Sequence, residues 1–251
     1  MVYNPYSLEG KTILVTGASS GIGQITAIEC SRLGAKLVIT GRNEERLSKT
    51  LGLLMGEGHS MIVADLDDDD AIVRLASDIP KLDGISCNAG IGVGIKPITF
   101  YKKSDLEQIF QTNTFSVALL IKELLKKKKL NRPSSLVLTS SIEGNYVTSI
   151  GNGMYGMTKA ALSSYARTVA LELAPKGARC NVVTPGMVKT PLIEPTGELT
   201  QEQLEADEAR YPLGRYGEPK DVAWAIIYLL SDASCWITGT TLKVDGGISL
   251  L

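Results

Sequence analysis

Short apolar runs alternate with helical patterns along most of the chain. The runs are rich in Val, Ile and Leu, whereas the segments between them repeat apolar residues at the spacing of an amphipathic helix. Near-continuous apolar strands separated by helices are typical of a parallel sheet covered on both faces. The pattern predicts an α/β fold, a doubly wound, seven-stranded parallel sheet with helices on both faces. We expect strands at about 11–16, 36–40, 60–64, 82–87, 135–140, 178–183 and 241–244, and helices at about 22–33, 44–54, 68–79, 104–128, 154–173 and 219–230.

One long segment departs from this alternation. Between Met187 and Tyr216 the chain contains several prolines and a polar stretch at 200–210. Doubly wound folds place ligands beyond the carboxyl ends of their strands, and long loops there are often lids. We therefore predict residues 187–216 as a substrate loop or lid within a single domain of residues 1–251. A simple surface insertion is the alternative.

The helix predicted at 104–128 has recognisable ends. Ser104, followed three residues later by Glu107, matches a capping box. Lys126 to Lys129 form a basic run, and cations at a helix C-terminus are favoured by the helix dipole. We interpret this run as a solvated helix end rather than a binding patch.

Composition disfavours several classes of function. The 26 basic and 27 acidic residues leave a formal net charge of −1, so no global field favours nucleic acid or an anionic membrane. No apolar stretch approaches the roughly 18 residues that span a bilayer, and no signal peptide is apparent. Four scattered cysteines and a single histidine, His59, provide no zinc set and argue against disulfides. We expect a soluble, cytoplasmic protein that binds no metal, nucleic acid or membrane.

A glycine-rich loop, TGASSGIG at residues 16–23, follows the first predicted strand and opens into a helix. Gly17 permits a sharp turn, Gly21 lets the backbone approach a pyrophosphate, and Gly23 allows the helix to pack closely on the strand. The helix N-terminus then offers unsatisfied N–H groups to an anion. The spacing is G-x-x-x-G-x-G rather than G-x-G-x-x-G, but the position indicates a Rossmann-like dinucleotide site.

The end of the second predicted strand, Thr40-Gly41-Arg42, indicates which nicotinamide cofactor is bound. A carboxylate at this place normally binds the free ribose hydroxyls of NAD(H), and Gly41 supplies none. Arg42 instead offers a guanidinium fork suited to a 2′-phosphate. We predict a preference for NADP(H), with NAD(H) as a possible cofactor. A solvent-facing arginine at the start of a charged helix is the alternative interpretation.

Two segments have the pattern Tyr-Gly-x-x-Lys, at 155–159 and at 216–220. On one continuous helix the two side chains share a face, one turn apart. A phenol with a pKa of about 10 is a poor acid/base near neutrality, and a neighbouring ammonium lowers that pKa. Gly217 and Pro219 argue against a continuous helix in the second segment. Only the first follows a predicted strand that ends in a serine pair, Ser140-Ser141, able to polarise a carbonyl oxygen.

With these motifs the chain resembles the short-chain dehydrogenase/reductase family, in its compact form of about 250 residues, over roughly residues 8–248. Further motifs of the family occur in the expected order: Asp65-Leu66, Asn88-Ala89-Gly90, Asn113, the set of Ser141, Tyr155 and Lys159, Pro185-Gly186, and Val244-Asp245-Gly246-Gly247. This combination is very specific, whereas a glycine triplet or a Tyr-x-x-x-Lys pair alone is weak.

The resemblance implies four catalytic residues. Tyr155 would exchange a proton with the substrate oxygen, and Ser141 would hydrogen-bond that oxygen. Lys159 would hold the nicotinamide ribose and lower the pKa of Tyr155, and Asn113 would keep, through its main chain, a water that links Lys159 to solvent. Thr190 would contact the nicotinamide amide. The expected cofactor contacts are Gly17, Ser19, Ser20, Gly21, Ile22, Gly23, Arg42, Asp65, Leu66, Asn88, Ala89, Gly90, Tyr155, Lys159, Pro185, Gly186, Val188 and Thr190.

Two positions depart from the family's pattern. Cys87 stands where the family has the first asparagine of Asn-Asn-Ala-Gly, and we interpret it as a small buried residue. The stretch from Ser141 to Tyr155 is one residue longer than usual, so Ser140 is an alternative to Ser141, although Ser141 fits the family's Ser-x-x-Gly better. Glu143 is interpreted as a solvated carboxylate, with a contact to a polar or cationic substrate as the alternative.

The resemblance implies an oxidoreductase that moves a hydride between NADP(H) and a small carbonyl or secondary-alcohol substrate, such as a 3-oxoacyl compound. The alternative is a nucleotide-binding or regulatory protein of the same fold without turnover, which the intact catalytic set disfavours; a sugar-nucleotide epimerase would need a longer chain. The family usually forms tetramers through the helices predicted at 104–128 and 154–173, so we expect a homotetramer. The candidate substrate-pocket residues are mostly apolar: Val93, Ile95, Ile142, Met154, Met187, Leu192 and Ile193.

Overall fold

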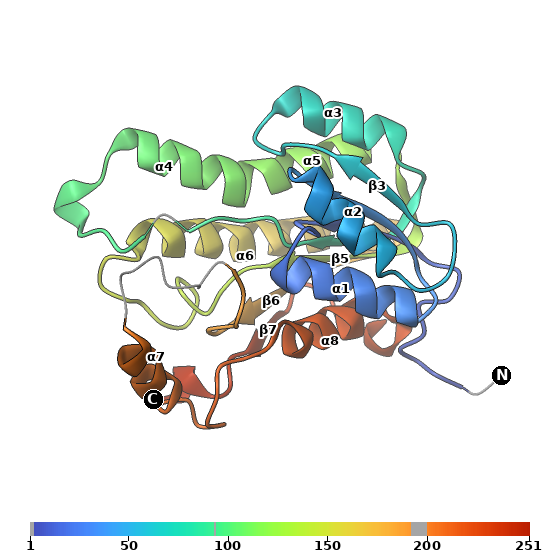
Figure 1. Ribbon diagram of the computed structural model, residues 1–251. Coiled ribbons are helices and arrows are strands. Elements are labelled where there is room, and N and C mark those ends of the chain that lie inside the picture. The colour runs from blue at the N-terminus through green and yellow to red at the C-terminus, as the bar shows by residue number, and fades with distance from the viewer. Residues whose placement is uncertain (1–2, 93, 192–199) are drawn as a thin grey trace.

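Seven parallel strands form one sheet in the order β3-β2-β1-β4-β5-β6-β7 in the computed structural model, which describes residues 3–92, 94–191 and 200–251 (Figure 1). Strand β1 pairs with both β2 and β4, so the direction of winding reverses between β1 and β4. The predicted doubly wound parallel sheet is therefore confirmed. The strands are β1 (Thr12–Thr16), β2 (Lys36–Gly41), β3 (Ser60–Val63), β4 (Leu82–Cys87), β5 (Leu130–Thr139), β6 (Ala178–Pro185) and β7 (Thr241–Val244).

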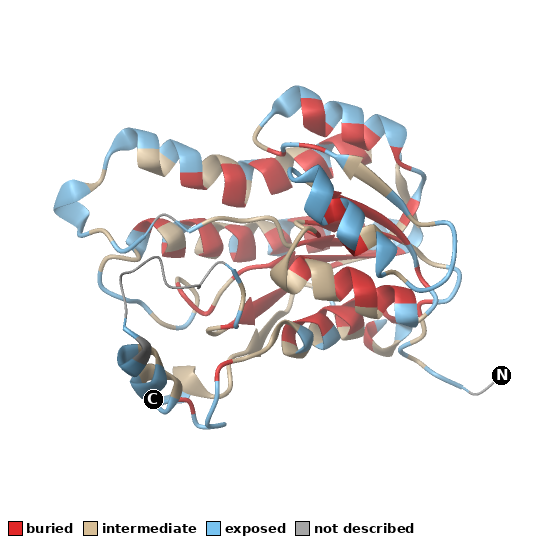
Figure 2. Ribbon diagram, in the orientation of Figure 1, coloured by how far each residue is buried: buried red, intermediate tan, exposed pale blue. Residues whose placement is uncertain are grey.

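Helices cover both faces of the sheet (Figure 1). They are α1 (Gly21–Arg32), α2 (Glu44–Gly52), α3 (Asp69–Asp78), α4 (Lys103–Phe110), α5 (Ser116–Lys126), α6 (Gly153–Leu173), α7 (Gln201–Glu208) and α8 (Pro219–Leu230). Leu14 packs with α3, α5 and α6, whereas its neighbours Ile13 and Val15 pack with α1 and α8. Successive strand residues face opposite layers, which explains the continuous apolar strands and the two buried layers in Figure 2. Among the described residues, no helix is long and apolar enough to cross a bilayer.

The helix predicted at 104–128 is divided in two. A π-helical turn at Gln111–Phe115 separates α4 from α5. The predicted capping box is wrong, because α4 begins at Lys103 and its N-cap is Lys102. Glu107 instead forms an ion pair with Lys103, 3.3 Å away and one turn earlier. Glu107 therefore pairs with a lysine on the exposed helix surface and does not take part in a cap.

The basic run after α5 is only partly a solvated helix end. Lys126 is exposed in the last turn of α5, as predicted. Lys129 differs, because its ammonium donates to the carbonyl oxygens of Ser77 and Ile79 at 2.8 and 2.6 Å. These carbonyls lie at the C-terminal end of α3, where a cation satisfies otherwise unpaired acceptors. Lys129 therefore joins two helix ends on one face of the sheet.

The polar stretch at 200–210 is more ordered than its composition suggested. Thr200 caps α7 in a capping box with Gln203. The side chain of Glu208, in the last turn of α7, lies 2.7 Å from Lys189 and accepts from the main-chain N–H of Tyr216. Within the described part of the predicted loop at 187–216, Glu208 of α7 therefore connects Lys189, near the start of the loop, with Tyr216 at its end.

Candidate active site

Three strand ends meet at the centre of the site. Thr16 closes β1, and its Oγ1 accepts hydrogen bonds from the main-chain N–H groups of Asn88 and Ala89 at 3.1 and 3.3 Å. Asn88 Oδ1 in turn accepts from Oγ1 of Thr139, the last residue of β5, at 2.7 Å. These bonds fix the carboxyl ends of β1, β4 and β5 at the point where the winding reverses, which is where such sheets bind ligands.

The glycine loop between β1 and α1 has the expected close approaches. A Cβ atom on Gly17 would lie 2.8 Å from the main-chain N of Ala89, and one on Gly23 would lie 2.4 Å from the carbonyl oxygen of Gly17. Gly17 also has a φ of +63°, which an L side chain rarely adopts. Ser20, the N-cap of α1, is extended and makes no side-chain cap bond, so the N–H groups of the first turn face the loop without a capping side chain. This arrangement fits a pyrophosphate.

A cavity of about 340 Å³ lies over this loop. Most of the expected cofactor contacts line it, namely Gly17, Ser19, Ser20, Gly21, Ile22, Gly23, Arg42, Asp65, Leu66, Asn88, Ala89, Gly90 and Thr190. Sequence reasoning missed further lining residues, Asn43, Arg46, Asp67, Ile91, Thr112 and Pro191. Arg46 carried a signal, since it lies one turn beyond Arg42 in the same charged stretch. The others lie in loops, except Thr112 in the π-helical turn, and no sequence motif marks them.

The remaining expected contacts do not line this cavity. Lys159 is buried and Tyr155 is half-buried, and neither of them lines it. Val188 is buried in the core and forms an isolated bridge with Gly217. A Cβ on Gly186 would lie 3.2 Å from Asp245 and 3.3 Å from the Tyr211 ring, so Gly186 allows tight packing of its own segment. Its structural role is clear, whereas a direct contact of Pro185, Gly186 or Val188 with a cofactor stays a prediction.

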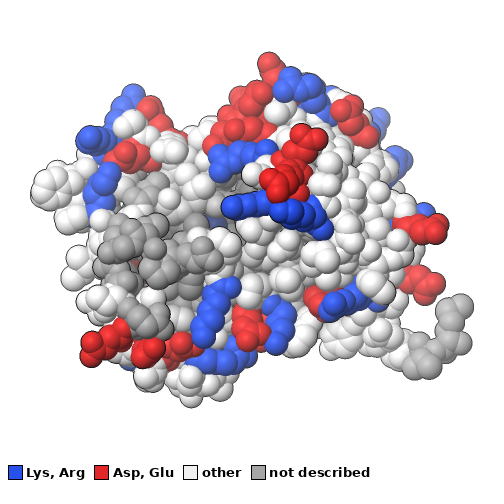
Figure 3. All heavy atoms as spheres, in the orientation of Figure 1, with Lys and Arg blue, Asp and Glu red and all other residues white. Residues whose placement is uncertain are grey.

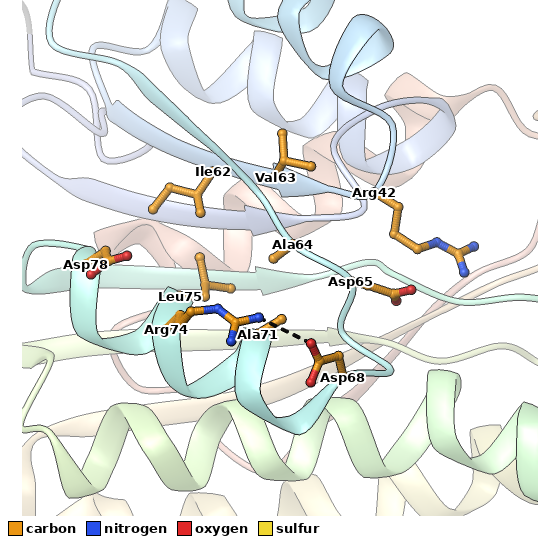
Figure 4. Close-up of a pocket in the computed structure, with 10 residues that line it drawn as sticks. All are labelled: Arg42, Ile62, Val63, Ala64, Asp65, Asp68, Ala71, Arg74, Leu75 and Asp78. Atoms are coloured by element: carbon orange, nitrogen blue, oxygen red, sulfur yellow. Dashed lines mark hydrogen bonds and ion pairs between the residues drawn. The ribbon is translucent and has the colours of Figure 1, made fainter.

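Arg42 stands at the rim of the cavity. Its side chain is 59% exposed, and Nη1 lies 3.9 Å from Oδ2 of Asp67. A long, exposed ion pair of this kind contributes little to stability, so the guanidinium is available to an anionic ligand. A second cavity of about 420 Å³ adjoins the first and shares Arg42, Ala64 and Asp65 with it (Figure 4). Its rim includes the ion pair of Arg74 and Asp68, at 3.2 Å. On the face drawn in Figure 3, basic and acidic side chains are interspersed.

Tyr155 and Lys159 lie one turn apart in α6, as predicted. Lys159 Nζ is 5.5 Å from the centroid of the Tyr155 ring and donates to the carbonyl oxygen of Thr139 at 3.1 Å. Only 4% of Lys159 is exposed, and burial lowers the pKa of its ammonium to about 8. A Cβ on Gly90 would lie 3.4 Å from this Nζ. The glycine of the Asn-Ala-Gly motif therefore makes room for the lysine.

The phenol of Tyr155 does not show the lowered pKa that the sequence suggested. Burial raises the pKa of Tyr155 to about 12, the hydrogen bond with Ser141 lowers it, and the carboxylate of Glu143 raises it further. Lys159 does not offset this rise, since its Nζ donates to Thr139 rather than to the phenol and is itself desolvated. Tyr155 is consequently a protonated acid at neutral pH.

The two adjacent serines have different surroundings. Ser140 is buried and its Oγ donates to the carbonyl oxygen of Lys159 at 2.7 Å, while it accepts from Asn145 Nδ2 at 3.0 Å. Ser141 Oγ accepts from the main-chain N–H of Glu143 at 3.1 Å and is hydrogen-bonded to Tyr155. Ser140 is thus held within the protein, whereas Ser141 lies beside the phenol. This placement favours Ser141 over the alternative.

Asn113 lies within the π-helical turn between α4 and α5 and is fully buried. Its Oδ1 accepts from the N–H of Ile91 at 2.8 Å, and its Nδ2 donates to the carbonyl oxygen of the same residue at 2.9 Å. The amide therefore holds the segment after Asn-Ala-Gly in place. A π-turn displaces main-chain groups from regular helical pairing and is frequent at functional sites, but the water relay through the Asn113 main chain stays a prediction.

Other residues weighed from the sequence can now be placed. Cys87 is buried, and burial raises the pKa of its thiol to about 12, which fits the interpretation of a small core residue. Glu143 is only 6% exposed, so the prediction of a solvated carboxylate is wrong. Among the candidate substrate-pocket residues, Ile142 and Met154 are buried and Ile95 is exposed. Val93, Leu192 and Ile193 lie outside the described residues.

Comparison with known proteins places this geometry in context. The family described as enoyl-(acyl carrier protein) reductase matches residues 17–249. A 3-oxoacyl-[acyl-carrier-protein] reductase, FabG, of Rickettsia felis is 36% identical over 244 residues, which cover 97% of this chain and 99% of that protein. A solved structure named as a short chain dehydrogenase/reductase family protein is 35% identical with a TM-score of 0.85, covering 98% and 100% of the two chains. Another, from Beutenbergia cavernae, is named as an NAD(P)-dependent gluconate 5-dehydrogenase with bound NADP; it is 27% identical with a TM-score of 0.87, covering 99% and 100%.

Proposed function

Because the chain belongs to the short-chain dehydrogenase/reductase family of oxidoreductases, we propose that it transfers a hydride between NADP(H) and a carbonyl or secondary-alcohol substrate. The observation that carries the proposal is the grouping of Ser141, Tyr155 and Lys159 beside the strand ends that support the glycine loop. A nucleotide-binding protein without turnover would need the loop and its cavity but not a serine hydrogen-bonded to the half-buried Tyr155.

Residues of the glycine loop and α1 would hold the pyrophosphate, with Arg42 and Arg46 at the adenosine end of the same cavity. When bound, the nicotinamide supplies the hydride. Ser141 accepts a bond from the N–H of Glu143, so its own hydroxyl proton is free to be donated to the substrate oxygen or to Tyr155. Tyr155 then gives its proton to the carbonyl oxygen in reduction and takes it back from the alcohol in oxidation.

In this proposal Lys159 supplies protons to Tyr155, and Asn113 holds the segments around Lys159 in place. With a pKa of about 8, the Lys159 ammonium is close to its titration range near neutrality and can pass a proton toward the phenol. Asn113, next to it, holds the main chain of Ile91 on one side and Thr158 on the other. Tyr155 is protonated at neutral pH, which is the form that gives a proton to a carbonyl oxygen. The 3-oxoacyl reductases among the relatives make 3-oxoacyl thioesters the first substrates to test.

Assembly and compartment belong to the same proposal. Phe115, Met157 and Leu171 expose apolar side chains on the turn before α5 and along α6, which supports a homotetramer built on these helices. The catalytic unit would be a single domain with residues 187–216 as its substrate loop. The protonated buried Cys87, together with two other buried free cysteines, suits a reducing cytoplasm.

The cofactor preference can be tested apart from catalysis. Removing the guanidinium in Arg42→Ala should weaken NADPH binding by about tenfold, since one charge-assisted phosphate contact is lost, and leave NADH binding unchanged. Fluorescence titration with both cofactors measures this. A tighter binding of NADH than NADPH by the unaltered protein would contradict the preference.

Turnover itself is tested with a panel of ketones, hexoses and 3-oxoacyl thioesters, followed by the consumption of NADPH. We expect reduction of at least one class of carbonyl. Binding of NADPH without turnover of any member of the panel would instead favour a regulatory nucleotide-binding protein.

A further inference from the structure

Ser141 lies just beyond the end of β5, where the sheet no longer holds it from both sides. The main-chain N–H groups of its neighbours Ser140 and Ile142 donate to carbonyl oxygens of β6 at 2.9 and 3.0 Å. Ser141, between them, therefore turns its own main-chain groups away from β6. On that other side the ladder with β4 ends at Leu138, before it reaches the serine. The proposed hydrogen-bond donor to the substrate thus depends on contacts outside the sheet.

The side-chain amide of Asn145 supplies such a contact. Its Nδ2 donates to the main-chain carbonyl oxygen of Ser141 at 2.8 Å and to Oγ of Ser140 at 3.0 Å. An amide nitrogen carries two N–H groups, so it can bond both adjacent serines at once. An ionised aspartate has the same shape but no donor, and it could make neither bond.

A tight turn brings Asn145 back toward the serines. The main-chain N–H groups of Asn145 and of the two residues after it donate to the carbonyl oxygen of Ile142, at 3.0, 2.8 and 3.1 Å. Gly144, in the same turn, has a φ of +79°, and a Cβ there would lie 2.1 Å from the carbonyl oxygen of Gly156. Because Gly156 directly follows Tyr155, the turn packs against the part of α6 that carries the proposed acid/base.

The second bond of Asn145 connects this turn with α6. Ser140 Oγ donates to the main-chain carbonyl oxygen of Lys159 at 2.7 Å and accepts from the hydroxyl of Ser163 at 3.2 Å. All three of these residues are buried, so water does not compete for the bonds. A path of hydrogen bonds therefore runs from the carbonyl of Ser141 through Asn145 and Ser140 to the backbone of the helix that carries Lys159.

We propose that Asn145 is a positioning residue for the reaction, which holds the main chain of Ser141 in place relative to Tyr155 and Lys159. The inference rests on the proposed function, since the position of Ser141 matters only if its hydroxyl meets the substrate oxygen. A displacement of about 1 Å in a reacting group can cost about 10²-fold in rate. Asn145 does not line the cavity over the glycine loop, so losing its amide should spare cofactor binding.

Two variants remove the amide donors in different ways. Asn145→Asp keeps the shape of the side chain but sets a carboxylate against two acceptor oxygens, and Asn145→Ala removes the amide without adding a charge. We expect each variant to lower kcat for NADPH-dependent reduction by about 10–10²-fold, with the Kd of NADPH unchanged. Denaturant unfolding shows whether each variant folds, and Asn145→Ala carries the test if Asn145→Asp does not.

Ser140→Ala is the matched control. It removes one bond of Asn145 but keeps the bond from Asn145 to the carbonyl of Ser141, so it should retain turnover.

A double-mutant cycle shows whether Asn145 acts through Ser141. Once Ser141→Ala has removed the hydroxyl, adding Asn145→Ala should lower kcat no further. Losses that multiply would overturn the inference, because Asn145 would then act by another route. An unchanged kcat in the folded single variants would also overturn it, and so would a loss of NADPH binding in parallel with kcat.

Ser141→Ala alone separates the two proposals. If this variant loses turnover while both Asn145 variants keep it, the role of Asn145 fails and the reaction stands. If Ser141→Ala and Tyr155→Phe are both fully active, the proposed function fails as well.

Discussion

The two Tyr-Gly-x-x-Lys segments share four-residue spacing but differ in structure. Tyr155 and Lys159 lie on one continuous helix, α6, with the ammonium 5.5 Å from the ring centroid. In the second segment α8 begins only at Pro219, as the sequence predicted, so Tyr216 lies outside the helix that carries Lys220. Helix continuity therefore decides whether this spacing brings the two side chains onto one face.

The partners of the side chains differ as well. Tyr216 donates to the carboxylate of Asp207 at 2.8 Å, and burial together with this bond raises the pKa of its phenol. Lys220 lies 2.6 Å from Glu218, which raises the pKa of its ammonium. In the first segment the phenol meets Ser141, and burial lowers the pKa of Lys159. The second segment is satisfied within the protein, whereas the first leaves a serine, a phenol and a desolvated lysine for a substrate.

A large effect that sharpens this contrast concerns Ser141, which is hydrogen-bonded to the tyrosine of the first segment. Ser141→Ala should lower kcat by about 10²–10³-fold, because a donor to the developing oxyanion is lost. Ser140→Ala should retain turnover and lose about 1 kcal/mol of stability, because its bonds stay within the protein. Steady-state rates and denaturant unfolding of both variants measure this. The opposite pattern would assign the reaction to Ser140.

The lysines provide the next comparison. Lys159→Met should lower kcat/KM by at least about 10²-fold, because the phenol loses its nearby proton source. Lys220→Met should leave kcat/KM unchanged, since it breaks only an exposed ion pair with Glu218. Assays of both variants with the same carbonyl substrate give the ratio. Equal losses would mean that the second segment also takes part.

The same substitution has a smaller effect of opposite sign on stability. The pKa of Lys159 falls from 10.5 to about 8 on folding, so the folded state binds the proton less well than the unfolded state. The cost is present in full below pH 8 and disappears as the pH rises toward 10.5. Lys159→Met should raise the free energy of unfolding at neutral pH by about 1–3 kcal/mol, with the gain shrinking across this window. Thermal unfolding at several pH values measures it, and a gain that is constant with pH would contradict desolvation as the cause.

Most of the fold could be predicted because it depends on patterns that the sequence displays directly. Buried parallel strands such as Thr12–Thr16 are apolar on both faces. The glycine loop directly follows this first strand, a position that indicates a dinucleotide site. The π-helical turn at Gln111–Phe115 was not predicted, because the apolar spacing continues through it into α5. Asn113, within this turn, is hydrogen-bonded to Ile91, a contact between distant segments that no local pattern reveals.

The electrostatics of the site could not be predicted for a related reason. The motif was enough to recognise Tyr155 and Lys159 as candidate catalytic residues. The raised pKa of the phenol, however, results from burial, which only the packed structure shows. Glu143 was taken as solvated because a glutamate usually is. Its burial follows from the close contact of Gly144 with Gly156, two glycines that lie on different elements. Motifs reveal which residues meet, whereas packing decides how far those residues are buried and how far their pKa values shift.

The central claim is that the hydroxyl of Tyr155 moves the proton in a carbonyl/alcohol reaction. Its most direct test is kcat for NADPH-dependent reduction by Tyr155→Phe, with Tyr216→Phe as the matched control and NADPH binding measured on both. We predict a loss of about 10³-fold or more in Tyr155→Phe with cofactor binding retained, and near-normal turnover in Tyr216→Phe. Full turnover by Tyr155→Phe, folded and loaded with NADPH, would contradict the account.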